Sequence, residues 1–534
     1  MPVDLPRGRR TGVRTQIPPS RLDSRHIFSR EARRLSPEEV AGWNRRNQPL
    51  LDLYGLEVAS VMVLPVVRPE ASRTAAGRLQ GELRDRILLT GMLGALSVSM
   101  SGRGDLLPHP PEARDRLKKS VKENNDRNST AAMTEALHAM CDASPDVSLR
   151  VAIGEGARKK PGEKGGNPTL YAGQVIGSPR EAAPAYSIAV DTVEGTTKST
   201  LFDPSCGTLL FVTGSSIAAV PDVYFDKCQV AGVDQVSVAD SPEKIIEAVA
   251  AAHGTREVNL FCLDRPRHPI ERMLAAGANV RIDTDGDAYP VVAAGLRWGV
   301  YPDNLRPLDG VAGNIGGAAE MIASAAGGYY LGVRTTARFC ASKIKSWEER
   351  YDFSQDDEKE IRDHGLDPAR LYRIEDLVPG LAGSDGAFVA AAISDNWHIP
   401  CLNAAFVGAN FASVSALFVG AAGSADIYAV LFTYRQPLEE TTIRITPVLT
   451  RLLGLPAKEI PSATRAAVAQ PALARRLRHE VATSYYMHLS EGDRPSANGE
   501  AAIRLDLRAA AEVESAEAMA FLRAVTDAAP DWFA

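Results

Sequence analysis

The segment of this sequence with the clearest capacity for chemistry is residues 191–196, which read Asp-Thr-Val-Glu-Gly-Thr. It follows the apolar run 186–190, which predicts a buried strand. A tight turn at Gly195 would bring the carboxylates of Asp191 and Glu194 and the Thr196 hydroxyl toward one point. Carboxylate oxygens are hard ligands, so this pattern favours Mg²⁺ or Mn²⁺. An acidic surface turn is the plainer interpretation of the segment taken alone.

Two further acidic positions accompany glycines. Glu155 lies between Gly154 and Gly156, directly after the apolar run 149–153. Glu320 follows the glycine-rich residues 313–317 and lies near the expected start of an alanine-rich helix. Glycines let a backbone approach a ligand closely, and a helix N-terminus attracts phosphate. Glycine patterns are weak indicators by themselves, so the acidic residues beside them carry the prediction of a cation and phosphate site.

Two more segments suit a phosphorylated sugar. Arg265 and Arg267 flank Pro266 after an expected strand over 258–263, and paired guanidinium groups can hold a phosphate through two hydrogen bonds each. Asp285 and Asp287 flank Gly286 after another expected strand over 280–282, and their carboxylates can accept sugar hydroxyls. A solvated basic turn and an ordinary acidic turn are the alternatives.

The bulk composition agrees with a small-molecule enzyme. The chain has 534 residues, 45% of them apolar, a net charge of −6 and six scattered cysteines without metal-ligand spacing. An acidic balance disfavours a nucleic-acid-binding surface, and scattered cysteines suggest reduced thiols. No apolar run reaches the length of a membrane helix, and the start lacks the apolar region of a secretory signal. We therefore expect a cytoplasmic protein that binds neither nucleic acid nor membranes.

The elements that must position these residues indicate a mixed fold. Residues 1–35 are rich in arginine and predict a disordered tail. Ser36, Pro37 and Glu39 predict a capped helix, which begins a helical N-terminal extension over 36–79. Further helices are expected over 78–100 and 129–140. From residue 147, short apolar runs alternate with turns and amphipathic segments, which indicates an α/β or layered α+β architecture. Residues 451–534 are expected to form a helical C-terminal extension.

Taken in order, these motifs resemble class II fructose-1,6-bisphosphatases, members of the lithium-sensitive, metal-dependent phosphatase superfamily. The resemblance spans about residues 80–450 and implies a catalytic region of two αβ subdomains. The implied fold is the layered αβαβα sandwich of that superfamily. It also implies Mg²⁺ or Mn²⁺ as cofactor and assembly as a homodimer or homotetramer.

The resemblance also assigns roles to individual residues. It implies a metal-binding set of carboxylates: Asp126, Glu155, Asp191, Glu194 and Glu320. It implies a catalytic set in which Thr196 orients or activates the nucleophile: Thr196, Asp191, Glu194 and Lys122. Lys122 and Asp126 are expected just before the helix over 129–140. The implied substrate-binding set is Gly195, Thr196, Tyr224, Arg265, Pro266, Arg267, Asp285, Gly286, Asp287 and Gly317.

The chain also departs from the family pattern. Thr192 and Ala319 stand where prolines are usual, and residues 157–160 read Ala-Arg-Lys-Lys where acidic residues are usual. The expected reaction is hydrolysis of fructose 1,6-bisphosphate to fructose 6-phosphate and phosphate, a step of carbohydrate metabolism in gluconeogenesis. One alternative is a phosphatase for another substrate, such as sedoheptulose 1,7-bisphosphate, an inositol phosphate or a sugar phosphate of a specialised pathway. A second alternative is a non-catalytic, sugar-phosphate-binding regulator.

Overall fold

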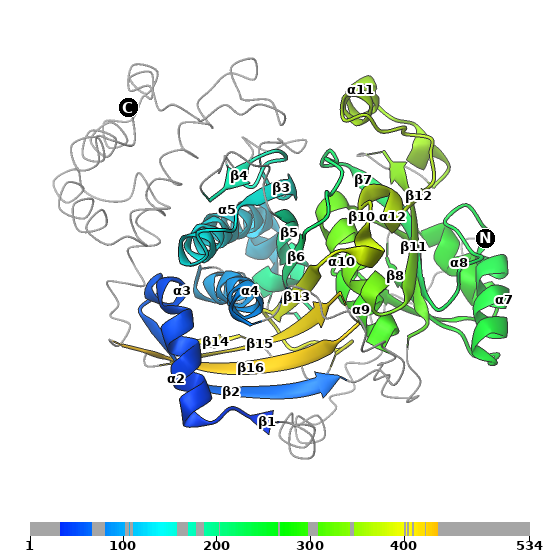
Figure 1. Cartoon of the computed structure of the whole chain (residues 1–534). Coiled ribbons are helices and arrows are strands. Elements are labelled where there is room, and N and C mark those ends of the chain that lie inside the picture. The colour runs from blue at the N-terminus through cyan, green and yellow to red at the C-terminus, as the bar shows by residue number, and fades with distance from the viewer. Residues whose placement is uncertain are drawn as a thin grey trace, which may run out of the picture.

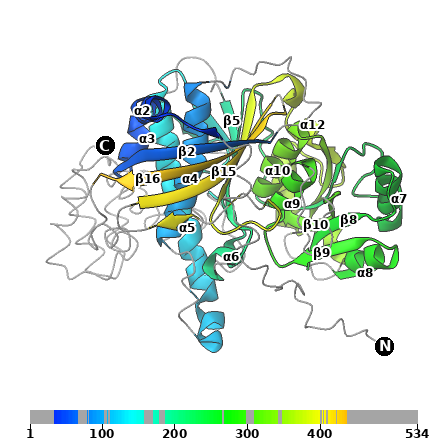
Figure 2. The same ribbon diagram turned by 90° about the horizontal axis from the view of Figure 1, so that it is seen from below.

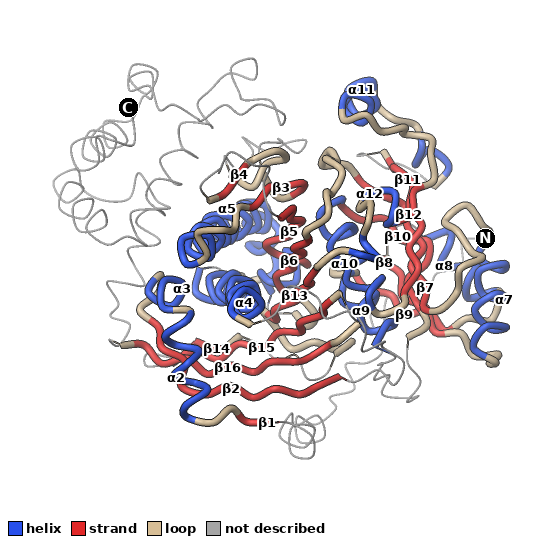
Figure 3. Tube along the Cα trace, in the orientation of Figure 1, coloured by secondary structure: helices blue, strands red, loops and turns tan. Residues whose placement is uncertain are grey.

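In the computed structural model, the chain forms two mixed sheets with helices between and outside them (Figure 1; Figure 3). The structure describes residues 33–66, 79, 81–101, 106, 110–156, 169–177, 186–201, 203–264, 267–296, 308–341, 347–399, 402, 405–407, 411–421 and 423–435. Most of the expected arginine-rich tail and the whole expected C-terminal extension lie outside these residues.

The larger sheet brings together strands from both ends of the described chain. Its spatial order is β1 (Arg33–Arg34), β2 (Leu56–Val66), β16 (Ala425–Tyr434), β15 (Phe411–Gly420), β13 (Gly386–Ala392), β6 (Gly207–Thr213), β5 (Tyr186–Glu194), β3 (Leu149–Ile153) and β4 (Val175–Ile176), with β14 (Phe406–Val407) paired to β15. Every residue of β6 and β13 is buried, because helices cover both faces of these strands. Neighbouring β3 and β5 are parallel, so their carboxyl ends reach the same side of the sheet.

The smaller sheet has the spatial order β12 (Tyr372–Arg373), β11 (Val333–Cys340), β7 (Tyr224–Ala231), β10 (Gly310–Gly317), β8 (Asn259–Leu263) and β9 (Asn279–Asp283). Strands β10, β8 and β9 are parallel, whereas β7 runs antiparallel to β10. The carboxyl ends of the three parallel strands therefore lie beside the amino end of β7. The loops that follow these strands carry the acidic and basic motifs of the sequence.

The helices complete five layers (Figure 1; Figure 2). Helices α4 (Glu82–Ser101) and α5 (Pro111–Ala143) pack on the outer face of the larger sheet, and α9 (Ala288–Leu296) and α10 (Ala318–Tyr330) lie between the sheets. The outer face of the smaller sheet is covered by α7 (Pro242–His253) and α8 (Arg267–Ala275). Three apolar clusters fill the four spaces between layers, because the largest cluster lies on both sides of α9 and α10. This arrangement confirms the expected layered αβαβα sandwich.

Shorter helices connect or flank these layers: α2 (Pro37–Arg46), α3 (Gln48–Asp52), α6 (Thr196–Leu201), α11 (Gln355–Asp363), α12 (Ile374–Leu377), η2 (Glu348–Tyr351) and η3 (Leu381–Gly383). The expected capping box is present, since Ser36 Oγ accepts the Glu39 N–H and the Glu39 carboxylate accepts the Ser36 N–H. In the part of the chain that the structure describes, no helix has the length and apolar character to cross a membrane.

Two local expectations differ from the structure. The helix expected over 129–140 begins at Pro111, so Lys122 and Asp126 lie inside α5 and not before it. Proline suits the first helical position, and the charged residues that follow it favour helix, so the proline-rich stretch starts the helix. The segment 36–79 is not helical throughout, because β2 is a strand of the larger sheet paired with β16. Its run of valines and leucines favours a strand.

Candidate active site

The catalytic turn, residues 191–196, lies where β5 leaves the larger sheet. The pairing register of β5 with β6 shifts between Asp191 and Glu194, so both acidic residues remain in the strand although its ladder is interrupted. Gly195 then has a φ of +78°, which places it in the left-handed region, and α6 begins at Thr196. The sequence-based expectation of a tight turn at Gly195 is therefore confirmed.

The two carboxylates of this turn are buried and bonded to backbone donors. Asp191 is 6% exposed and its Oδ1 accepts the Val193 N–H at 3.0 Å. Glu194 is 4% exposed and its Oε1 accepts the Ala288 N–H at 2.8 Å, which ties β5 to the start of α9. One hydrogen bond to each buried carboxylate leaves its second oxygen for another partner.

Helix α5 brings the two residues implied by the resemblance to the catalytic turn. Thr196 Oγ1 lies 3.2 Å from Asp126 Oδ1 and 3.1 Å from the Val193 carbonyl oxygen, the two acceptors open to its proton. Lys122 Nζ donates to Thr197 Oγ1 at 3.1 Å. Since Lys122 and Asp126 are four residues apart on one helix, they share a face, and that face lies against the start of α6.

Glu155 and Glu320 approach the same turn from different sheets. Glu155 follows β3 and is half-buried. A Cβ on Gly154 would lie 2.7 Å from the Leu170 carbonyl oxygen, so the glycine there allows a close approach of the backbone. Glu320 lies in the first turn of α10 and its carboxylate accepts the Gly317 N–H, which caps its own helix.

Electrostatic coupling joins these carboxylates into one cluster. Burial raises the pKa of Asp191 well above its ordinary value. The neighbouring charges that add to this rise are, in order, those of Glu194, Glu155 and Glu320. Burial likewise raises the pKa of Glu194, with further contributions from Asp287 and Glu320. The charges around Asp191 and Glu194 therefore disfavour their ionised forms, an effect that a bound cation would offset.

The donor chemistry of this cluster fits a hard divalent cation, because its ligands are carboxylate oxygens without thiols or imidazoles. In the described part of the chain, no three acidic, histidine or cysteine side chains converge into a ready-made metal site. One oxygen of each of Asp191, Glu194 and Glu320 is held by a backbone N–H, which leaves the other oxygen of each carboxylate for a cation.

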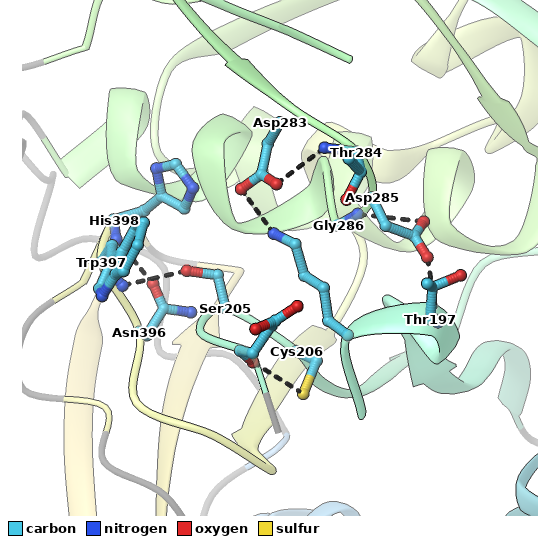
Figure 4. A network of polar contacts seen from close by, with 12 residues as sticks. Thr197, Ser205, Cys206, Asp283, Thr284, Asp285, Gly286, Asn396, Trp397 and His398 are labelled. Atoms are coloured by element: carbon cyan, nitrogen blue, oxygen red, sulfur yellow. Dashed lines mark hydrogen bonds and ion pairs between the residues drawn. The ribbon is translucent and has the colours of Figure 1, made fainter. Parts of the chain in front are cut away.

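The loop of residues 283–287 is docked against α6, at the residues that follow the catalytic turn (Figure 4). Thr197 N–H donates to Asp285 Oδ2 at 3.3 Å, and Lys198 Nζ lies 2.7 Å from Asp283 Oδ2. Gly286 has a φ of +78° and reverses the chain at the centre of the loop. The loop follows β9 as the sequence suggests, but its partners on α6 were not predicted.

A fully buried lysine lies at the other end of this loop. Lys227 Nζ is 2.8 Å from Asp287 Oδ2, and the Asn314 side-chain amide also donates to that oxygen. Burial disfavours the charge of Lys227, but Asp287 and Glu320 outweigh it and raise its pKa. Sequence analysis missed Lys227 and Lys198. The available signal was a lysine inside an otherwise buried strand and another directly after the catalytic turn.

The remaining substrate-binding positions are described only in part. Tyr224 begins β7, is half-buried, and is the pairing partner of Gly317, three residues before Glu320. Arg267 begins α8 at the carboxyl side of β8, and its side chain lies outside what the structure describes. Arg265 and Pro266 lie outside the described residues, as does the basic segment 157–160. Their assigned roles therefore stay predictions.

An unassigned imidazole lies beside this network. His398 is 1% exposed, contacts the ring of Phe261 edge-on at 5.3 Å, and leaves both ring nitrogens without a hydrogen-bond partner. Burial, followed by the charges of Arg281 and Lys198, lowers its pKa well below the ordinary value. His398 is therefore neutral at neutral pH.

The layered fold and the buried carboxylate cluster beside a threonine hydroxyl define the chain as a phosphoric monoester hydrolase of the sugar-phosphatase type. The model of the glpX-encoded bacterial fructose-1,6-bisphosphatase family matches residues 112–419, more than half of the chain. The chain belongs to this family. A search of curated proteins gives no match.

Proposed function

We propose that this chain hydrolyses a phosphate ester of a sugar bisphosphate, most directly fructose 1,6-bisphosphate to fructose 6-phosphate and phosphate, with Mg²⁺ or Mn²⁺. The observation that carries the proposal is the pair of buried carboxylates Asp191 and Glu194, with Glu320 near them and the Thr196 hydroxyl beside Asp126. Such a cluster is unfavourable without a cation, and phosphoryl transfer is a reaction in which such cations serve.

The residues that would hold the cations are those of the predicted metal set: Asp126, Glu155, Asp191, Glu194 and Glu320. A divalent cation in this set supplies Lewis acidity toward the phosphate and lowers the pKa of a bound water. Each carboxylate comes from a rigid helix or from the end of a strand, so the chain fixes the direction from which the phosphate is held.

Thr196 is proposed to orient the attacking water. Its proton is directed at Asp126 Oδ1 or the Val193 carbonyl, which leaves the oxygen lone pairs to accept a hydrogen bond from that water. Lys122 adds a positive charge one residue away, at the Thr197 hydroxyl. The first turn of α10 offers the positive end of a helix to the phosphate oxygens.

The sugar is proposed to bind against the loop 283–287, with its second phosphate near Arg265 and Arg267. Carboxylates of the loop accept sugar hydroxyls, and the two arginines suit a phosphate at the far end of the substrate. Gly195, Pro266, Gly286 and Gly317 would lie close to the substrate through their backbones. A phosphatase for another phosphorylated sugar is the second candidate, because residues 158–160 carry positive charge where the family pattern is acidic.

The test is phosphate release from a panel containing fructose 1,6-bisphosphate, sedoheptulose 1,7-bisphosphate, fructose 6-phosphate and an inositol monophosphate, each with MgCl₂, MnCl₂ or excess EDTA. Release from the first substrate at the highest kcat/KM, abolished by EDTA and by Glu194→Gln, is the expected result. Preference for another phosphate ester favours the second candidate. Tight binding without release from any substrate favours a non-catalytic regulator.

Assembly is proposed on the family resemblance, and location on the features of the sequence. We expect a homodimer or homotetramer, and sedimentation equilibrium of the full chain tests this. We also expect a cytoplasmic location, which fractionation of the native host tests. A monomer that is fully active would contradict the proposed assembly.

A further inference from the structure

We propose that Lys198 and Lys227 are positioning residues that fix the two ends of the loop 283–287 against the catalytic turn, an inference that rests on the proposed function. Lys198 Nζ lies 2.7 Å from Asp283 Oδ2, and these side chains are 4% and 15% exposed. Lys227 Nζ lies 2.8 Å from Asp287 Oδ2, and these side chains are 0% and 3% exposed. The loop therefore has a buried cation at its first residue and another at its last.

The two lysines belong to different halves of the sandwich. Lys198 lies on α6, which follows β5 of the larger sheet, whereas Lys227 lies on β7 of the smaller sheet. The loop itself follows β9 of the smaller sheet. The pair of Lys198 with Asp283 thus connects the two sheets at the point where the sugar is expected to bind.

Three successive residues at the start of α6 have different tasks. Thr196 contacts Asp126, the Thr197 N–H donates to Asp285 Oδ2, and Lys198 pairs with Asp283. The hydroxyl proposed to orient the water and the two contacts that hold the loop therefore lie within one turn of helix. A displacement of the loop relative to Thr196 would require one of these contacts to break.

Glycines lie beside both lysines. A Cβ on Gly286 would lie 2.8 Å from the Ser205 carbonyl oxygen and 3.4 Å from Lys198 Nζ. A Cβ on Gly316 would lie 2.7 Å from Lys227 Nζ and 3.0 Å from Asp287 Oδ2. Ser205 and Gly286 face the same network in the close-up view (Figure 4). Glycine at position 316 therefore leaves room for the Lys227 ammonium beside Asp287.

Ion pairs of this kind specify geometry more than they add stability, because burying both charges costs desolvation energy. In a substrate site, correct geometry appears as binding and orientation of the substrate. Lys198 pairs with Asp283, which is outside the predicted metal set, so its loss should affect sugar binding more than the chemical step. Lys227 interacts electrostatically with Glu320 and Glu194, so its loss should affect both sugar binding and the chemical step.

The experiment compares Lys198→Met, Lys198→Arg and Asp283→Asn with the wild-type full chain, using fructose 1,6-bisphosphate and MnCl₂. Lys198→Met keeps the length of the side chain and removes its charge. We expect KM to rise about tenfold with kcat within about threefold of wild type, and partial recovery of KM in Lys198→Arg. Lys244→Met is the matched control, because Lys244 pairs with Asp240 at 2.6 Å on the surface, and its KM should not change.

A double variant distinguishes the loss of the ion pair from nonspecific disruption of the site. If the two groups act as a pair, Lys198→Met with Asp283→Asn should raise KM no further than either single change, whereas independent effects would multiply. Lys227→Met should raise KM and also reduce the gain in melting temperature produced by MnCl₂. A folded Lys198→Met with wild-type KM, or multiplying effects in the double variant, would overturn the proposal.

A binding measurement keeps this result distinct from failure of the proposed function. Calorimetric titration of fructose 1,6-bisphosphate into the Mn²⁺-loaded chain should show about tenfold weaker binding by Lys198→Met, even if no phosphate is released. Equal affinity of wild type and variant rejects the positioning role and leaves hydrolysis standing. Absence of binding to wild type rejects both.

Discussion

Relative to the wild type, Asp191→Asn is expected to raise the melting temperature of the protein without metal and to lower it in the presence of metal. The asparagine keeps the shape of the side chain, and its Oδ1 can still accept the Val193 N–H that now lies 3.0 Å from the carboxylate. It removes a negative charge that Glu194, Glu155 and Glu320 disfavour at this position. The metal-free variant should therefore melt at a higher temperature than the wild type, while turnover and metal binding are lost.

The size of the effect follows from the charges. Each unit by which burial raises the pKa of a carboxyl costs its ionised form about 1.4 kcal/mol. Two unit charges about 4 Å apart at an effective dielectric of about 20 interact by about 4 kcal/mol. A relief of about 1.4–4 kcal/mol corresponds to a rise of roughly 2–6 °C in melting temperature for a domain of about 300–400 residues.

The difference in stability between Asp191→Asn and the wild type should depend on pH in a definite direction. Because the pKa of Asp191 is raised in the folded chain, the folded state favours its protonated form. The stability linked to that proton is present below the unfolded pKa of about 4 and is lost as the pH rises through the raised folded pKa. The advantage of Asp191→Asn over wild type in EDTA should therefore be larger at pH 8 than at pH 5.

The assay is thermal melting of both proteins in excess EDTA and in excess MnCl₂, with phosphate release measured in parallel. We expect less than about 1% of wild-type turnover and a much smaller Mn²⁺-induced gain in melting temperature. Asp226→Asn is the matched control, since Asp226 is equally buried on β7 but pairs with Arg350 and Tyr351. Its Mn²⁺-induced gain should persist. A lower melting temperature of Asp191→Asn in EDTA, or turnover near the wild-type level, would refute the reasoning.

Three further predictions concern single side chains. Thr196→Val removes the hydroxyl that lies 3.2 Å from Asp126 and should lower kcat about 100-fold. Thr196→Ser keeps a hydroxyl and should retain at least a tenth of the wild-type kcat. Equal turnover of the two variants would contradict the role of the hydroxyl. The pKa of His398 is lowered in the folded chain, so the unfolded chain binds more protons below about pH 6.5. The free energy of unfolding should therefore fall there by up to about 1.4 kcal/mol per pH unit. Melting curves between pH 7 and 5 should show that the melting temperature of His398→Phe depends less on pH than that of the wild type. A Cβ on Gly207 would lie 1.7 Å from the Tyr289 hydroxyl, so Gly207→Ala should cost about 3 kcal/mol or more in urea unfolding, with partial recovery on adding Tyr289→Phe.

Much of the candidate site could be predicted because its acidic residues follow strands. Glu155 follows β3 and Glu194 ends β5, and the carboxyl ends of two parallel neighbours lie together by geometry alone. The apolar run 186–190 predicted the buried strand that leads to Asp191 and Glu194. Local sequence therefore sufficed wherever a side chain is positioned by the element that carries it.

Other residues could not be placed in that way. The role of Lys198 depends on Asp283, 85 positions along the chain, and no local pattern marks such a partner. Alternation along β7 predicts which face of the strand carries Lys227. It does not predict which residues lie next to Lys227 on that face. The start of α5 was not predicted because prolines commonly end regular structure, although Pro111 here begins the helix.

The order of strands in the larger sheet has a practical consequence for trimming the protein. The family match covers residues 112–419, but β2 and β16 complete the sheet beside β15, and α4 covers β6, β13 and β15. A fragment cut at the limits of the match would leave β15 with unpaired backbone groups and expose the apolar residues that α4 now buries. Open strands and uncovered apolar faces promote aggregation. The smallest soluble catalytic fragment should therefore begin before Leu56 and end after Tyr434.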